Sequence, residues 1–172
     1  MRFVVATGRE PGCGSLAKVR YTPTSFRNRT GSHMPAKNIH HDAVVDALKA
    51  DGWTITHDPF PLTVDERDLY IDFAAERPVI GAEKGTDRIA VEVQSFMNPS
   101  DVRNLQEALG QYILYRVILA RQHPDRPLFL SVSRKVYDGI LSEELGRIVL
   151  TDLNVRVLVF DPTTRKVFRW IS

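Results

Sequence analysis

The segment Ile89-Ala-Val-Glu-Val-Gln94 constrains the fold most, because it places a carboxylate within an otherwise apolar strand. Side chains alternate along a strand, so positions 89, 91 and 93 share one face and enter the core. Positions 90, 92 and 94 share the other face, where the small Ala90 leaves space beside Glu92. A carboxylate there is costly unless a partner such as a divalent cation compensates its charge. The alternative is that Glu92 and Gln94 reach solvent at the end of the strand.

Apolar spacing and turn residues predict the remaining elements. We expect helices over residues 38–51, about 102–122 and 135 to about 150, and a loop from 58 to 67. We expect strands over residues 53–57, 69–74, 79–84, 88–96, 127–132, 155–160 and 166–171. These elements, taken in chain order, predict an α/β (α+β) fold in which helices flank a mixed central β-sheet, with a C-terminal β-hairpin.

Charge divides the chain into two parts at Met34. Six of the 23 Lys and Arg and one of the 21 Asp and Glu precede it, so residues 34–172 carry 17 basic against 20 acidic residues, a net charge of −3. Residues 1–33 show no sustained period and predict a flexible leader ahead of one domain over 34–172. Gly31-Ser-His-Met34 looks like an expression-vector remnant, and a start codon assigned too early explains the leader equally well. Any DNA binding by the domain requires a local basic patch.

Several classes of protein are excluded by what the sequence lacks. No apolar run approaches the ~18–20 residues of a membrane-spanning helix, and no secretory signal is apparent, so we expect a cytoplasmic protein. The single Cys13 offers neither an internal disulfide nor a metal-ligand cluster. There is no Gly-rich phosphate loop, no HExxH and no GxSxG, which argues against nucleotide hydrolases, zinc proteases and ordinary esterases.

A second carboxylate, Asp72, interrupts the predicted strand 69–74 twenty positions before Glu92. If the two strands are neighbours, Asp72 and Glu92 converge at one end of the sheet. Two carboxylates suit Mg²⁺, with Mn²⁺ as an alternative, since Mg²⁺ takes few protein ligands and keeps several waters. Gln94, on the same face as Glu92, is placed to orient a water or a phosphate, although it lacks the positive charge that a lysine would supply. We therefore predict Asp72, Glu92 and Gln94 as catalytic and the first two as metal ligands.

An Asp, a spacer and Glu-x-Lys on a strand form the PD-(D/E)xK nuclease pattern, in which Gln94 replaces the lysine. Longer and more specific segments are His41-Asp-Ala-Val44, Asp51-Gly-Trp-Thr-Ile-Thr-His-Asp-Pro59, Asp68-Leu-Tyr-Ile-Asp72, Ala82-Glu-Lys-Gly85, Ile89-Ala-Val-Glu-Val-Gln-Ser-Phe96, Ala108-Leu-Gly-Gln-Tyr-Ile-Leu-Tyr115 and Val159-Phe-Asp161. Through these segments the chain resembles the XisH family over essentially Met34 to Ser172.

The resemblance implies an excision controlling factor of the fdxN element in cyanobacteria, with a restriction-endonuclease-like core. It implies DNA as a partner, a small companion called XisI and, indirectly, a site-specific recombinase; a homodimer is left open. Two functions compete: a Mg²⁺-dependent endonuclease that cleaves DNA, and a non-catalytic DNA-binding or partner-binding subunit that keeps the nuclease fold. In a third, the pair acts at a target other than the excision junction.

The nuclease comparison also gives meaning to two helical positions. Gln111 and Tyr115 are four apart and share one face of the long helix. The spacing is similar to that of RecB-like nucleases, in which this helix lines the site. The alternative is that Tyr115 packs in the core with Tyr112 and Leu119 while Gln111 is solvated.

Other candidates are supporting ones. His41, at the start of the first predicted helix, either contacts a metal or phosphate or caps the helix. Lys84, beside Glu83, replaces the lysine missing at position 94 if its strand adjoins that of Glu92. His57-Asp58, before Pro59, is interpreted as a turn. The basic clusters Arg134-Lys135 and Arg165-Lys166-Arg169 either meet phosphate or form solvated faces, and solvated faces are the more usual case.

Overall fold

The strand expected over residues 88–96 lies in the middle of the fold. In the computed structural model, which describes residues 38–78 and 86–172, it is β5 (Thr86–Gln94). It pairs antiparallel with β4 (Phe73–Pro78) and parallel with β6 (Leu128–Ser133). Residues 89, 91 and 93 are buried on one face and Ala90 on the other, as the alternation predicts. Glu92 is only 5% exposed, so the alternative in which it reaches solvent is wrong.

A six-stranded mixed sheet in the order β1-β4-β5-β6-β7-β8 forms the centre of the domain, and β2 and β3 form a separate two-stranded sheet. The predicted mixed sheet and C-terminal hairpin of β7 and β8 are thereby confirmed. The remaining elements are α1 (His41–Ala50), β1 (Thr54–His57), β2 (Phe60–Val64), β3 (Arg67–Ile71), α2 (Asp101–Gln122), α3 (Arg134–Val136), the π-helical turn η1 (Tyr137–Leu141), α4 (Glu144–Asp152), β7 (Val157–Asp161) and β8 (Lys166–Ile171).

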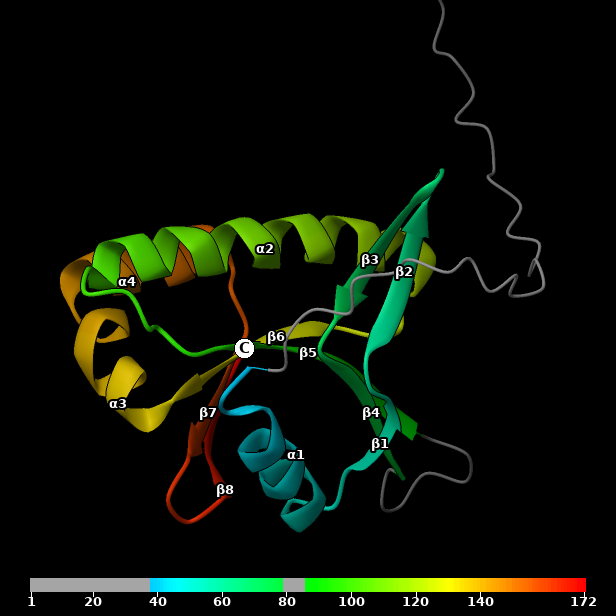
Figure 1. Ribbon diagram of the computed structural model, residues 1–172, viewed down its shortest axis with the longest axis horizontal. Helices are drawn as coiled ribbons and strands as arrows, with labels where there is room; N and C mark the ends of the chain where they lie inside the picture. The colour runs from blue at the N-terminus through cyan, green and yellow to red at the C-terminus, as the bar shows by residue number, and fades with distance from the viewer. Residues whose placement is uncertain (1–37, 79–85) are drawn as a thin grey trace, which may run out of the picture. The chain divides into compact units, whose positions relative to one another are not determined.

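Helices cover both faces of the sheet, so two cores form (Figure 1). On one face, Leu105, Ala108 and Tyr112 of α2 pack with Phe60 and Leu62 of the β2–β3 hairpin against the sheet. On the other face, α1 packs through its buried apolar side chains, Val44, Ala47 and Leu48. Because both faces are covered, polar side chains in the covered part of the middle strands, such as Glu92 and Ser131, are withdrawn from water. This placement sets the electrostatics of Asp72 and Glu92.

The loop expected from residue 58 to 67 is wrong, because Phe60–Val64 pairs with Arg67–Ile71 as a hairpin. Pro61 conceals this strand from sequence patterns, but proline is tolerated in a two-stranded ribbon, where one edge needs no partner. The single strand expected over 69–74 divides at Asp72, where the chain leaves the hairpin and enters the sheet. The Asp72 carboxylate accepts the Val93 N–H, so a side chain satisfies a backbone donor at this break.

The helix expected from residue 135 to about 150 is also interrupted. Gly139 has φ −87° and ψ −120°, outside the helical region, and it separates the first turns from α4. The two pieces pack closely at Gly146, where an added Cβ would lie 2.1 Å from the Ile140 carbonyl oxygen. The strand expected over residues 79–84 lies outside the described residues. Within those ranges, no helix is long and apolar enough to cross a membrane.

Candidate functional site

Asp72 and Glu92 face each other across β4 and β5. Phe73 pairs with Val91 in this antiparallel ladder, and Asp72 directly precedes β4, so one further step of the same register would bring Asp72 opposite Glu92. The Val93 N–H donates to Asp72 Oδ2 at 2.8 Å, which holds the carboxylate against β5. The sequence prediction required only that the two strands be neighbours, and they are. Both acids lie where β5 approaches its carboxyl end.

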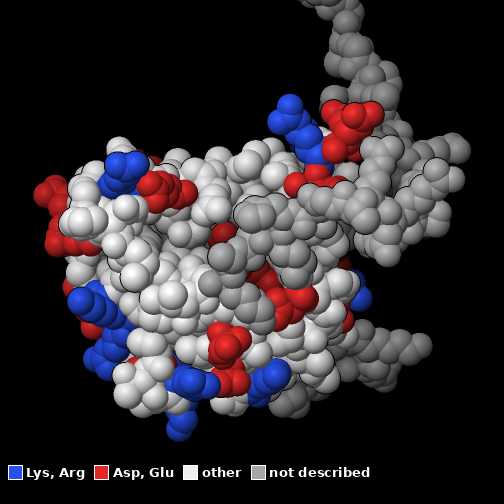
Figure 2. All heavy atoms as spheres, in the orientation of Figure 1, with Lys and Arg blue, Asp and Glu red and all other residues white. Residues whose placement is uncertain are grey.

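Glu92 carries the strongest electrostatic perturbation of the site. Burial, and then the nearby charge of Asp72, raise the pKa of the Glu92 carboxyl to about 9, while hydrogen bonding to Gln94 and the Asp72 backbone acts in the opposite direction. Glu92 Oε2 is buried and has no hydrogen-bond partner among the described residues. Such an atom is costly unless something outside the chain binds it. Asp and Glu atoms are visible at the centre of this face, between α1 and α2 (Figure 2).

Asp72 is perturbed in the same direction. Burial raises the pKa of its carboxyl above the usual range, against the lowering effects of the Val93 N–H and of His41. The charge of Asp58 adds to the increase. Two carboxyl groups that are both harder to ionise than usual, side by side, form an environment that favours a cation.

His41 connects this pair to a residue that sequence patterns assigned elsewhere. His40 occupies the N-cap position of α1, so the alternative in which His41 caps the helix is wrong. The His41 side chain is buried against Phe73, with ring centroids 4.8 Å apart, and its Nε2 lies 2.9 Å from Asp58 Oδ2. Asp58, interpreted from sequence only as a turn residue before Pro59, therefore belongs to the candidate site. An acid next to a proline carries no signal that distinguishes it from an ordinary turn.

Gln94, Gln111 and Tyr115 extend the site onto α2. Gln94 Nε2 lies 3.5 Å from Glu92 Oε1 and also donates to Gln111 Oε1. Burial, followed by the charges of Glu92 and Asp72, raises the pKa of the Tyr115 hydroxyl, and a hydrogen bond with Gln111 opposes the increase. Tyr115 also packs at the margin of the α2 core. The structure thus brings the helix positions Gln111 and Tyr115 beside the carboxylates.

The donor set decides which metal would fit. Among the described residues, no group of three or more His, Cys, Asp and Glu side chains is arranged to hold an ion. Two oxygen ligands with one partnerless oxygen, Glu92 Oε2, fit Mg²⁺ or Mn²⁺, because a hard cation of this kind retains waters or phosphate oxygens as its other ligands. The supporting candidates Glu83 and Lys84 lie outside the described residues.

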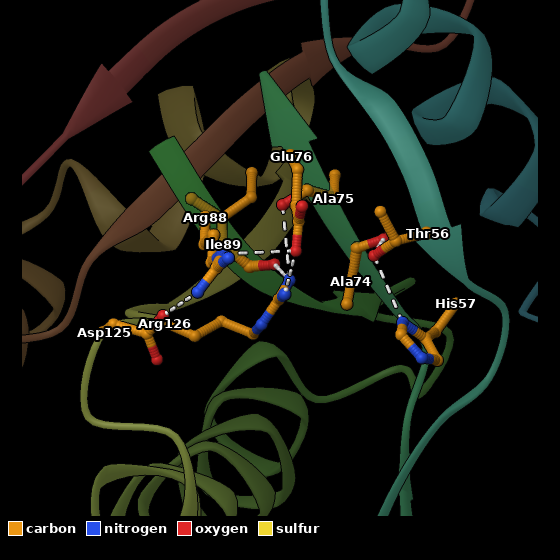
Figure 3. Close-up of polar contacts among 9 residues, drawn as sticks. All are labelled: Thr56, His57, Ala74, Ala75, Glu76, Arg88, Ile89, Asp125 and Arg126. Carbon is orange, nitrogen blue, oxygen red and sulfur yellow. Dashed lines mark hydrogen bonds and ion pairs between the residues drawn. The ribbon is translucent and has the colours of Figure 1, made fainter. Parts of the chain in front are cut away.

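The opposite end of β4 and β5 holds a different arrangement of charges (Figure 3). There, Glu76 pairs across the ladder with Arg88. Arg126, only 8% exposed, donates to Glu76 Oε1 at 2.6 Å and to the carbonyls of Ala75 and Ile89. Arg88 in turn contacts Asp125. Every charged group of this network has an opposite charge beside it.

Comparisons with known proteins place the chain among relatives of one kind. The family model described as "XisH protein" matches residues 34–168. The crystal structure of an XisH family protein from Nostoc punctiforme PCC 73102 is similar, with a TM-score of 0.70 and 34% identity over 78% of this chain and 100% of that one. A fdxN element excision controlling factor protein from Anabaena variabilis has the same TM-score and identity over 79% of this chain and 100% of its own. Among curated proteins, no significant match is found.

Proposed function

The chain belongs to the XisH family, and from this premise we propose that it is a metal-dependent DNA endonuclease that acts as an excision controlling factor. In this proposal Asp72 and Glu92 bind Mg²⁺, or Mn²⁺ in its place. The fold is of the restriction-endonuclease-like, PD-(D/E)xK type, with Gln94 at the position of the lysine. DNA is the substrate, a XisI-like protein is the companion, and a site-specific recombinase is an indirect partner.

One observation carries this proposal: Glu92 is buried beside the half-buried Asp72, and among the described residues no lysine or arginine forms an ion pair with either carboxylate. Burial raises the pKa of both carboxyls, and Glu92 Oε2 accepts no hydrogen bond within the described chain. A structural carboxylate on a middle strand would be expected to have an arginine or several N–H donors, as Glu76 has. An acidic pair that destabilises the empty fold is typical of a site selected for a ligand.

The chemistry divides between the ion and the chain's own residues. When bound, Mg²⁺ supplies a Lewis acid that polarises a phosphodiester and makes water a better nucleophile. Val93, through its N–H, holds the Asp72 carboxylate in place. Gln94, itself positioned by Gln111, presents an amide that can orient a water or a phosphate oxygen but cannot neutralise charge. The contact between His41 Nε2 and Asp58 Oδ2, at 2.9 Å, fixes the orientation of the imidazole ring.

The second candidate function is a non-catalytic subunit that binds DNA or a protein partner. Gln94 favours it, because a lysine at that position would add positive charge beside the phosphate and the amide of glutamine does not. The net charge of −3 over residues 34–172 favours it as well, since such a domain benefits from a partner when it holds DNA. The two candidates share the acidic pair and differ in whether the phosphodiester is cut.

The distinguishing experiment is plasmid cleavage by the full chain with Mg²⁺, with Mn²⁺ and with a chelator, in the presence and absence of the companion protein. We expect nicking that needs a divalent ion and falls at least 100-fold in Asp72→Asn and Glu92→Gln, because each substitution removes a metal ligand and keeps the side-chain size. Matched controls are Asp152→Asn and Glu66→Gln, which change exposed acids at the end of α4 and in the turn between β2 and β3.

The outcomes separate the candidates cleanly. Cleavage that persists in Asp72→Asn and Glu92→Gln would assign it to a contaminant or to another site. Absence of cleavage under every condition, with DNA binding retained, would leave the non-catalytic subunit as the function.

A further inference from the structure

Two basic segments that are about 30 residues apart in sequence meet on one surface. Arg134 and Lys135 begin α3, and Lys166 and Arg169 lie on β8. All four side chains are exposed, and Phe168 between them is 42% exposed. We name this set, Arg134, Lys135, Lys166, Phe168 and Arg169, the basic–aromatic cluster. Lys and Arg atoms are visible over α3 and over the β7–β8 hairpin (Figure 2).

Aromatic rings hold the arginines of the basic–aromatic cluster in place. The Arg134 Cζ atom lies 4.2 Å from the centroid of the Phe168 ring. The Arg169 Cζ atom lies 5.7 Å from the Phe168 centroid and 5.8 Å from that of Tyr137, whose hydroxyl accepts from Arg169 Nη1 at 3.4 Å. Cation–π contacts restrict guanidinium groups without neutralising them, which leaves an organised pair of cations at the surface.

The cluster keeps an excess of positive charge. Arg134 Nε forms an ion pair with Asp138 Oδ2 at 3.3 Å. Backbone hydrogen bonds lower the pKa of the Asp161 carboxyl, and the charge of Arg134 adds to this effect. Lys135, Lys166 and Arg169, by contrast, have no ion-pair partner among the described residues. A domain with a net charge of −3 thus concentrates partnerless cations over one small area, which is the kind of local patch that a polyanion requires.

Sheet topology places the cluster on the same edge as the acidic pair. Strands β5, β6 and β7 are parallel, with Gln94 paired to Val132 and Ser133 paired to Phe160. The carboxyl ends of all three strands therefore meet at one edge. Arg134 follows Ser133 directly, and Lys166 pairs with Asp161 at the end of β7. Because neighbouring strands are about 4.8 Å apart, β8 lies about 14 Å from β5 along this edge.

We propose that the basic–aromatic cluster binds the phosphate backbone of double-stranded DNA and positions it along this edge toward Asp72 and Glu92. The direction of the DNA rests on the proposed function of the acidic pair; the binding itself does not. Arginines fixed on aromatic rings contact phosphates without a large loss of side-chain freedom. The positive charge of the cluster offsets the repulsion between the DNA phosphates and the acidic pair. The phosphates that the cluster binds would lie at a distance from the carboxylates.

The test is fluorescence anisotropy of a labelled 20-base-pair duplex with the full chain, in a chelator so that nothing is cut. We expect Lys135→Gln/Arg169→Gln to bind about tenfold more weakly at 100 mM salt. The slope of log K against log salt should become shallower by about 1.8, because each phosphate contact contributes about 0.9. Arg134→Gln alone should change the slope by about 0.9. The charge-matched control Lys49→Gln/Arg121→Gln, in the last turns of α1 and α2, should bind like the wild type.

The results separate this inference from the proposed function. Binding of DNA by the cluster is refuted if the wild type does not bind the duplex. It is also refuted if the Lys135→Gln/Arg169→Gln variant binds with the affinity and salt slope of the control. The urea midpoint of the variant, which should match that of the wild type, shows that the variant is folded. If binding by the cluster is refuted, metal-dependent cleavage can still stand. If binding depends on Lys135 and Arg169 but no cleavage occurs with any metal, the inference stands and the endonuclease proposal fails.

Discussion

The two ends of the β4–β5 ladder surround a glutamate in opposite ways, and Glu76 is half-buried whereas Glu92 is buried. At one end, Glu76 receives Arg126 at 2.6 Å and Arg88 at 3.4 Å. At the other end, burial and then the charge of Asp72 raise the pKa of the Glu92 carboxyl to about 9. The same two strands supply both acids, so the difference comes from how deeply each carboxylate is buried and from its partners.

The contrast separates a structural acid from a functional one. Arg126 joins β4 to β5 by donating to Ala75 and Ile89, and Glu76 completes its hydrogen bonding. Among the described residues, no donor supplies a hydrogen bond to Glu92 Oε2. The first network is expected to stabilise the fold, whereas the acidic pair is expected to cost stability until a cation binds. Substitutions that remove the charge at the two ends should therefore change the free energy of unfolding in opposite directions.

The largest expected effect comes from Arg126→Met, which removes the buried charge and keeps most of the volume. Two strand carbonyls and Glu76 lose a donor, and breaking a buried pair from one side typically costs about 3 kcal/mol or more. Urea unfolding at pH 7 measures this, with the exposed Arg121→Met as the control. A loss below about 1 kcal/mol would remove the structural role assigned to this end.

A smaller effect of opposite sign is expected for Glu92→Gln in the absence of divalent ions. The pKa of this carboxyl is about 9 in the fold against an ordinary 4.5, so between these values the folded chain holds a proton that the unfolded chain releases. Stability should then fall as pH rises from about 4.5 toward 9. Glu92→Gln removes this loss and should stabilise the protein at pH 8 by on the order of 2 kcal/mol.

Glu76→Gln is the matched comparison, since it makes the same chemical change at the other end of the ladder. It weakens the hydrogen bonding of Arg126 and should destabilise the protein. Chemical unfolding from pH 5 to 9 distinguishes the two. If both variants shift stability in the same direction, the contrast between the two ends is wrong.

The smallest effect is expected for Asp125→Asn, at the outer end of the arginine network. The hydrogen bond between Asp125 and Arg88 raises the pKa of Arg88 and lowers the pKa of the Asp125 carboxyl, as expected for ion-pair partners. Both side chains are about half exposed, however, so solvent and salt screen their attraction. The unfolding midpoint should stay within experimental error at 0.5 M salt, and a larger change would show that the outer pair supports Arg126.

Sequence periodicity predicted the middle of the fold better than its margins. The alternation of β5, the long helix before β6 and the C-terminal hairpin were all predicted and confirmed, because burial on a regular period leaves a clear pattern. Strand β2 was missed, since Pro61 interrupts its pattern. The break at Gly139 was missed as well, because one glycine within a helical period is compatible with either outcome.

The candidate site was predictable where it lies on regular elements. The positions of Asp72 and Glu92 follow from strand neighbours, and those of Gln111 and Tyr115 from helical spacing. Asp58 was not predictable as a site residue, because its contact with His41 joins a turn to a helix start 17 residues earlier. The convergence of Arg134 with Phe168 and Arg169 likewise depends on sheet order, which local patterns do not contain.

The most direct measurement is Mn²⁺ binding to the full chain, monitored through the electron paramagnetic resonance signal of the free ion. Competition with Mg²⁺ is measured in the same way. We predict one Mn²⁺ bound per chain, displaced by Mg²⁺, with affinity at least 100-fold weaker in Glu92→Gln and unchanged in Glu76→Gln. Equal binding by wild type and Glu92→Gln, or equal losses in Glu92→Gln and Glu76→Gln, would contradict the assignment of Asp72 and Glu92 as a cation site.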